Sequence, residues 1–176
     1  MTPTDPDLPC IIGVAQLTNR DGGVEPLDLW EQAALGAERD AGGPSVLGAI
    51  DDLGVVYCDA WRYDHPGERL AERLALGPGH REESLPAGTA HQRLLNAAAE
   101  RLMAGQTRVA LVVGGEALAT RRALRQGGGE PEWSFPAADQ RPMFDPEWFL
   151  PTEWDHGVLQ APGPFALMAS AHRAIN

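Results

Sequence analysis

Histidine and cysteine side chains can bind metal ions or act as bases and nucleophiles, but neither residue type forms a recognisable metal site in this sequence. Among 176 residues there are five histidines and two cysteines. No histidine pair has the His-x-His or His-x-x-x-His spacing that turns two ligands toward one ion, so no metal is expected. Cys10 and Cys58 are too few for a disulfide framework. Because free cysteines are usually buried, both are predicted to be inert structural thiols.

Glycine turns and arginines are the next candidates, as binding groups for anions. Gly114-Gly115 stands between an apolar run and a helical pattern, where an anion-binding turn would stand. The Gly-x-Gly-x-x-Gly and Gly-Lys-(Ser/Thr) patterns are absent, and Glu116 would repel phosphate, which disfavours a nucleotide site. Arg121 and Arg122 belong to the densest basic group. They either bind a phosphate or form a solvated helix face.

The elements that would position these residues alternate along the chain. Strands are expected at Cys10–Leu17, Leu53–Cys58, Glu83–Leu85 and Val109–Val113. Helices are expected from Pro26 to a stop at Gly42, from Pro66 to a stop at Gly77, from about Gly88 to Ala104, and after Glu116, with a short helical piece at Ser45–Asp51. This order predicts an α/β fold: a βαβαβαβ layer with a mostly parallel sheet and helices on both faces.

The segment from Gly88 to Glu116 gives the clearest prediction. Gly105 suits the left-handed position just after a helix, and Val109–Val113 reads as a strand covered on both faces. The helix before it should turn one apolar face inward, formed by Leu94, Leu95, Ala98, Leu102 and Met103.

The composition changes after Gly127. Prolines recur too often for long regular elements, and tryptophans stand between them, which argues against disorder. We therefore predict two domains: an α/β domain over 1–126, and an ordered but irregular Pro/Trp-rich lobe over 127–176. The lobe should lie against the α/β layer and include a helix at Phe165–Ile175.

Several of these residues resemble the thiolase superfamily. There, a helix ending Ala-Ala-x-x-(hydrophobic)-x-Ala-Gly leads into a buried strand closed by Gly-Gly-x-Glu or Gly-Ala-Glu. Ala98-Ala99, Ala104-Gly105 and Gly114-Gly115-Glu116 match that pattern, and Ile11–Ala15 looks like the first thiolase strand. The resemblance implies a thiolase-like α/β layer over roughly the first 125 residues.

The same resemblance places Gly88 where thiolases carry their nucleophilic cysteine. The chain is therefore most similar to a cysteine-free thiolase-like group, often labelled acetyl-CoA acetyltransferases. This implies a coenzyme A thioester as substrate and no further cofactor. His91 could hydrogen-bond a thioester carbonyl, or it could be a surface histidine. Arg121, Arg122 and Trp148 are the candidate contacts to coenzyme A.

The resemblance also implies partners. The chain stops before the fifth strand of a thiolase half, so it is expected to be a truncated or split subunit that is inactive alone. The alternative is a non-catalytic module for acyl-CoA binding or subunit assembly. Partners would be a second copy, a polypeptide carrying the missing half, or a zinc-ribbon/OB-fold protein.

The charge and the hydropathy of the chain argue against two classes of protein, those that bind nucleic acid and those that span a membrane. The formal net charge of −11 argues against nucleic acid, whose phosphates need clustered lysine and arginine. No apolar run approaches the roughly 20 residues that span a bilayer. The first residues lack the basic and apolar regions of a signal peptide, so a cytoplasmic location is expected.

Overall fold

The computed structural model describes residues 8–43, 46–138, 151–156 and 162–175. The chain divides into two compact units, Met1–Gln140 and Arg141–Asn176. Within the described ranges, no helix is both long and apolar enough to cross a membrane.

The first unit is built on a parallel sheet of three strands, as the alternating pattern predicts. Its order is β2 (His80–Glu83), β1 (Asp52–Val55) and β3 (Ala110–Val113). Asp52 pairs in register with His80 on one side and with Ala110 on the other. All residues of β1 are buried, because it is the central strand and is covered on both faces.

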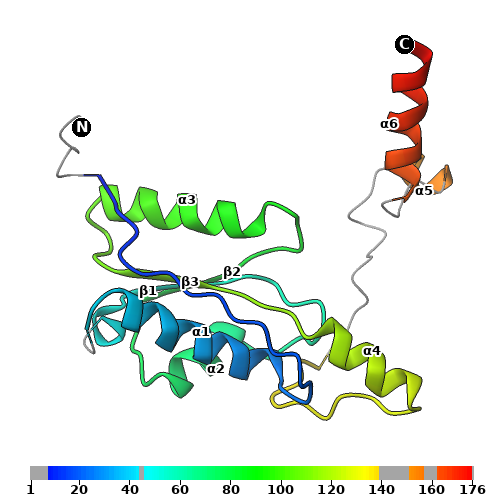
Figure 1. Cartoon of the computed structure of the whole chain (residues 1–176). Helices are drawn as coiled ribbons and strands as arrows, with labels where there is room; N and C mark the ends of the chain where they lie inside the picture. The colour runs from blue at the N-terminus through cyan, green and yellow to red at the C-terminus, as the bar shows by residue number, and fades with distance from the viewer. Residues whose placement is uncertain (1–7, 44–45, 139–150, 157–161, 176) are drawn as a thin grey trace. The chain divides into compact units, whose positions relative to one another are not determined.

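Helices cover both faces of this sheet (Figure 1). The helices α1 (Pro26–Asp40) and α2 (Pro66–Arg73) pack on one face, and α3 (Ala90–Met103) packs on the other. A 3-10 turn, η1 (Leu47–Ala49), precedes β1, and α4 (Leu118–Gln126) follows β3. The mixed α/β class and the parallel sheet expected from the sequence are both confirmed.

The main core lies between the sheet and the first two helices. Its largest buried side chains are Leu27, Trp30, Leu53, Val55 and Leu70. On the opposite face, only part of the apolar surface expected for α3 is covered. Leu94 and Ala98 are buried, whereas Leu95 is 40% exposed and Met103 64% exposed.

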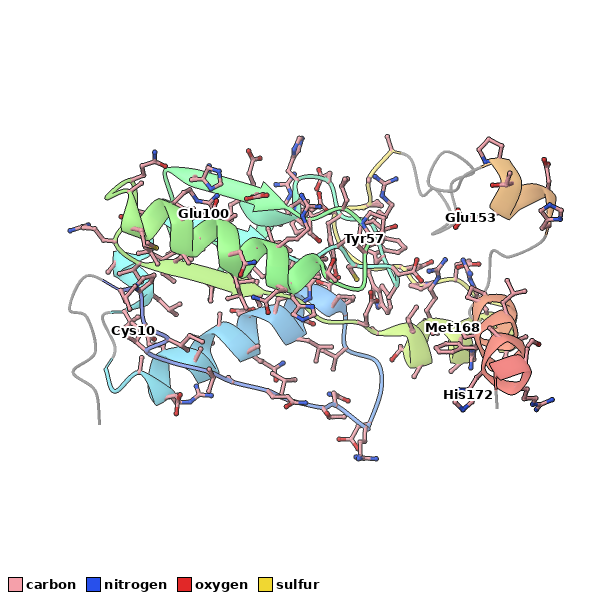
Figure 2. All side chains as sticks on the ribbon, turned by 90° about the horizontal axis from the view of Figure 1, so that it is seen from above. Cys10, Tyr57, Glu100, Glu153, Met168 and His172 are labelled. Carbon is pink, nitrogen blue, oxygen red and sulfur yellow. The ribbon has the colours of Figure 1, made fainter. Side chains whose placement is uncertain are left out.

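The strand expected at Cys10–Leu17 does not form. This segment, on which Figure 2 labels Cys10, has no assigned strand, and Ile11, Ile12 and Val14 are exposed. The backbone N–H of Val14 donates to the Asp40 carboxylate at 2.8 Å, a side-chain contact outside any ladder. Apolar β-branched residues favour a strand only where a neighbouring strand accepts their hydrogen bonds, so the pattern alone overstated this element. The strand expected at Glu83–Leu85 forms slightly earlier, as β2.

Residues 131–138, here called the strap, lie against the α/β layer. The Trp133 and Trp61 rings meet edge to face with centroids 5.7 Å apart. The indole Nε1 of Trp61 donates to the Ser134 carbonyl at 2.9 Å, and Tyr63 forms an antiparallel bridge with Pro136. The start of the Pro/Trp-rich region is thus ordered without being helix or strand.

The second unit contains two described helices. They are α5 (Pro151–Asp155) and α6 (Pro162–Ile175), on which Figure 2 labels Met168 and His172. The helix expected at Phe165–Ile175 is confirmed, beginning slightly earlier. Trp148 lies outside the described residues.

Candidate functional site

A hollow of about 310 Å³ opens beside the first turn of α3. It lies at the carboxyl ends of β1 and β3, where open α/β sheets usually bind ligands. Its walls are mainly apolar, with one imidazole. The lining residues are Val56, His91, Leu95, Val112, Val113 and Gly114.

Close packing of the two chain segments that leave β1 and β3 fixes the floor of the hollow. The N–H of Val56 donates to the Val113 carbonyl at 2.8 Å, which continues the ladder past β1. A Cβ at Gly114 would lie 2.6 Å from the Cβ of Val56, so only glycine fits there. The first glycine of Gly114-Gly115 is therefore required because the Gly114 backbone lies so close to the Val56 side chain.

His91 is the titratable side chain of the hollow, and the sequence singled it out. It sits in the first turn of α3 and is exposed. The amino end of a helix carries positive partial charge, which favours an acceptor group such as a carbonyl oxygen nearby. An N–H of the His91 ring, beside an apolar floor, can donate a hydrogen bond to the carbonyl of a bound molecule.

Gly88 lies in the exposed loop just before α3. A Cβ built there meets nothing within 4 Å, so a larger side chain would cause no steric clash. A cysteine would fit at this position, which the thiolase resemblance assigns to the nucleophile.

Neither cysteine lines the hollow. Cys58 is buried, and its thiol donates to the Glu116 carboxylate at 3.6 Å. Burial, and then the neighbouring charge of Glu116, raise the pKa of this thiol far above its ordinary value, so it is not a thiolate at neutral pH. Cys10 is exposed, contrary to the expectation that both cysteines are buried.

Glu116 has a structural role that the sequence did not reveal. Its carboxylate accepts the backbone N–H of Asp59 at 2.7 Å and that of Ala60 at 2.9 Å. Arg121 binds the same loop, because its Nη1 donates to the Asp59 carbonyl at 2.6 Å. Residues 58–60 are therefore held beside the carboxyl end of β3.

The other candidate residues are not gathered around the hollow. Arg121 is occupied with the Asp59 loop, and Arg122 is exposed on α4; neither lines the hollow. Across the described residues, no group of three or more His, Cys, Asp or Glu side chains is placed to hold a metal ion.

No protein-family model matches the chain, and no curated protein matches it. Solved structures do match. A monomeric SCP2-thiolase-like protein type 1 from Mycobacterium smegmatis is similar at a TM-score of 0.55 and 28% identity, over 62% of this chain and 24% of that one.

A second similar structure is OleA from Xanthomonas campestris, solved with cerulenin bound. The TM-score is 0.51 and the identity 21%, over 65% of this chain and 34% of that one. The two matches support a thiolase-like fold. The aligned region spans about a quarter of the first neighbour's length and about a third of the second's.

Proposed function

We propose that this α/β layer binds an acyl-CoA thioester at the hollow beside α3, without forming a covalent intermediate there. The observation that carries the proposal is the hollow itself: an apolar floor at the carboxyl ends of β1 and β3, with His91 as its titratable wall. The thiolase-like fold of the neighbours supports a coenzyme A thioester as the ligand class.

Each part of such a ligand has a matching group. The acyl chain would contact Leu95 and Val112, because burying apolar surface against apolar walls is favourable. His91 would donate a hydrogen bond to the thioester carbonyl. Arg122, which is exposed on α4 and lies outside the lining of the hollow, would contribute a positive charge for the phosphates of coenzyme A.

The chemistry proposed at the hollow is non-covalent. Acyl transfer through an enzyme thioester needs a thiolate within reach of the carbonyl. Gly88 holds the position that the thiolase resemblance assigns to that thiol, and the Cys58 thiol is bound to Glu116. An acetyl-CoA acetyltransferase-type reaction would therefore require a nucleophile from another part of the assembly.

Titration with acetoacetyl-CoA and with free coenzyme A tests this proposal, using calorimetry on the full chain. His91→Leu should weaken acetoacetyl-CoA binding about five- to tenfold, the worth of one neutral hydrogen bond. Free coenzyme A, which has no thioester carbonyl, should bind both proteins equally. Gln92→Leu, an exposed neighbour outside the hollow, is the matched control. Failure of acetoacetyl-CoA to bind, or equal binding by His91→Leu, would contradict the proposal.

A subunit-assembly role is the second candidate, and exposed apolar side chains favour it. Leu95 and Met103 on α3, and Ile11, Ile12 and Val14 before α1, are all at least 40% exposed. Apolar side chains in such number on one unit are typical of surfaces that another chain covers. The partner would be a second copy, a polypeptide with the remaining thiolase-like layers, or a zinc-ribbon/OB-fold protein.

A further inference from the structure

Asp52, His80 and Arg101 meet at the amino ends of β1 and β2, at the opposite end of the strands from the hollow. His80 Nδ1 lies 2.8 Å from Asp52 Oδ1. Arg101 donates to the same carboxylate from Nε at 2.7 Å and from Nη2 at 3.2 Å. The Asp52 side chain is only 1% exposed, so these hydrogen bonds take the place of those that water would make to the carboxylate.

The fold brings these residues together from three elements. Asp52 and His80 are partners in the parallel register of β1 and β2, so their side chains leave the same face of the sheet. Arg101 reaches them from the last turn of α3, which covers that face. The arrangement is therefore set by strand pairing and helix packing together.

The contact with Asp52 determines which nitrogen of His80 can react. A carboxylate oxygen accepts hydrogen bonds only, so the neutral ring must carry its proton on Nδ1. The lone pair is then on Nε2. The His80 side chain is 45% exposed while its partner is buried, so small molecules can reach the ring from solvent.

A purely structural role does not explain why the residue paired with Asp52 is a histidine. Arg101 already compensates the buried Asp52 charge through two hydrogen bonds, and leaves its Nη1 to bind Glu82 at 3.3 Å. An exposed first residue of an edge strand could be of almost any type. Histidine oriented by a buried carboxylate is the arrangement that makes an imidazole an effective base or nucleophile.

We propose that His80 is a nucleophilic histidine that accepts an acyl group at Nε2 from an uncharged, activated ester. Local charge selects this donor class. With a neutral imidazole, the charges of Arg101, Asp52 and Glu82 leave the cluster net negative by one. An anionic donor such as an acyl phosphate is repelled, whereas an uncharged ester is not.

The reaction balances without a further reagent. The Nε2 lone pair forms a bond to the acyl carbon, and the bond from that carbon to the leaving oxygen breaks, releasing an alkoxide or phenolate. The acylated ring keeps its Nδ1 proton and carries a positive charge beside Asp52. Water then attacks the acyl carbon and the N–C bond breaks. The carboxylic acid is released, and the histidine is left protonated until solvent takes the proton.

Two reagents test this on the full chain. Diethyl pyrocarbonate should modify His80 at least about fivefold faster than His65 or His91, which are also exposed, as followed by peptide mass mapping. With 4-nitrophenyl acetate, 4-nitrophenolate release above buffer should be lost in His80→Gln and retained in His156→Gln, a change in the second unit. Acetyl phosphate should acylate His80 more slowly than the uncharged ester.

Asp52 is a positioning residue, and its own test must separate orientation from folding. Asp52→Asn should slow His80 modification about tenfold or more at every pH, because the amide no longer fixes the Nδ1–H tautomer. If that variant does not fold, the ranking of histidines within the unaltered protein still decides the question. Modification of His80 no faster than His65 and His91, or nitrophenolate release unchanged in His80→Gln, would overturn the proposal.

Discussion

The Glu25 carboxylate accepts hydrogen bonds from both the backbone N–H and the hydroxyl of Ser134, each at 2.8 Å, although 109 residues separate the two. The same carboxylate accepts Arg73 Nη2 at 2.7 Å. Glu25 immediately precedes α1, Arg73 ends α2, and Ser134 belongs to the strap. One buried side chain therefore joins two helices and the strap.

Glu25→Ala should lower the free energy of unfolding by about 1–3 kcal/mol, because donors from Arg73 and Ser134 lose a buried acceptor. Urea denaturation followed by tryptophan fluorescence measures this. Glu132→Ala is the control, since Glu132 is exposed in the same strap. An unchanged midpoint in Glu25→Ala would show that the strap does not depend on this contact.

The two thiols should differ strongly in reactivity. Cys10 is exposed, whereas Cys58 is buried with a pKa raised by burial and by Glu116. A maleimide should therefore label Cys10 at least about a hundredfold faster than Cys58 in the native protein. Both should react alike in urea. Fast labelling of native Cys58, tested in Cys10→Ser, would contradict the buried Glu116 contact.

Acid should remove a stabilising contribution from Asp51. Hydrogen bonds from the Thr107 hydroxyl, and from the backbone N–H groups of Val109 and Arg108, lower the pKa of Asp51 from 3.8 to about 2. Because the folded-state pKa is depressed, the contribution is complete above pH 3.8 and is lost as pH falls through 2. With solvent screening at a partly exposed side chain, it amounts to about 1 kcal/mol.

Urea denaturation at pH 5 and pH 2.5 checks this expectation. Asp51→Asn should show a smaller loss of stability between the two pH values than the unaltered protein. Asp21→Asn, an exposed position in the turn before α1, should lose as much as the unaltered protein. Identical acid dependence in Asp51→Asn would refute the assignment.

Gly88→Cys should fold normally, because the added Cβ meets no neighbour within 4 Å. It should still show no thiolysis of acetoacetyl-CoA by coenzyme A. That reaction needs a thiolate, an acid–base group and an oxyanion site together, and the substitution supplies only the first. Maleimide labelling confirms that the new thiol is accessible. Coenzyme A-dependent cleavage above the buffer rate would disprove this prediction.

The chain should associate in solution through its exposed apolar surface. Light scattering at micromolar concentration should give a mass above the 18.9 kDa of one chain. Met103→Glu should lower that mass, because Met103 is 64% exposed on α3. Glu100→Gln, on the same helix in Figure 2, should not. A monodisperse monomer at all concentrations would rule out self-association.

Much of the fold could be predicted where the determining interactions are local. Apolar spacing predicted α3, and the residue type at Gly105 predicted the turn, where φ is 67°. The β-branched run predicted β3, and Pro26 and Pro66 begin α1 and α2. Each of these signals acts over a few residues, so the sequence displays it directly.

Part of the candidate site was also predictable. His91 was identified from its place at the start of a helix, and the structure puts it on the hollow. Arg121 was identified from charge density alone, which does not show that it contacts the Asp59 loop.

Tertiary structure alone decided the rest. An apolar pattern predicted a strand at Cys10–Leu17, but a strand requires a partner that the pattern does not name. The same limit applies to the contacts of Glu116 with Ala60, Glu25 with Ser134, and Asp52 with His80. A buried carboxylate must find donors, but which donors it finds depends on strand register and helix packing far along the chain.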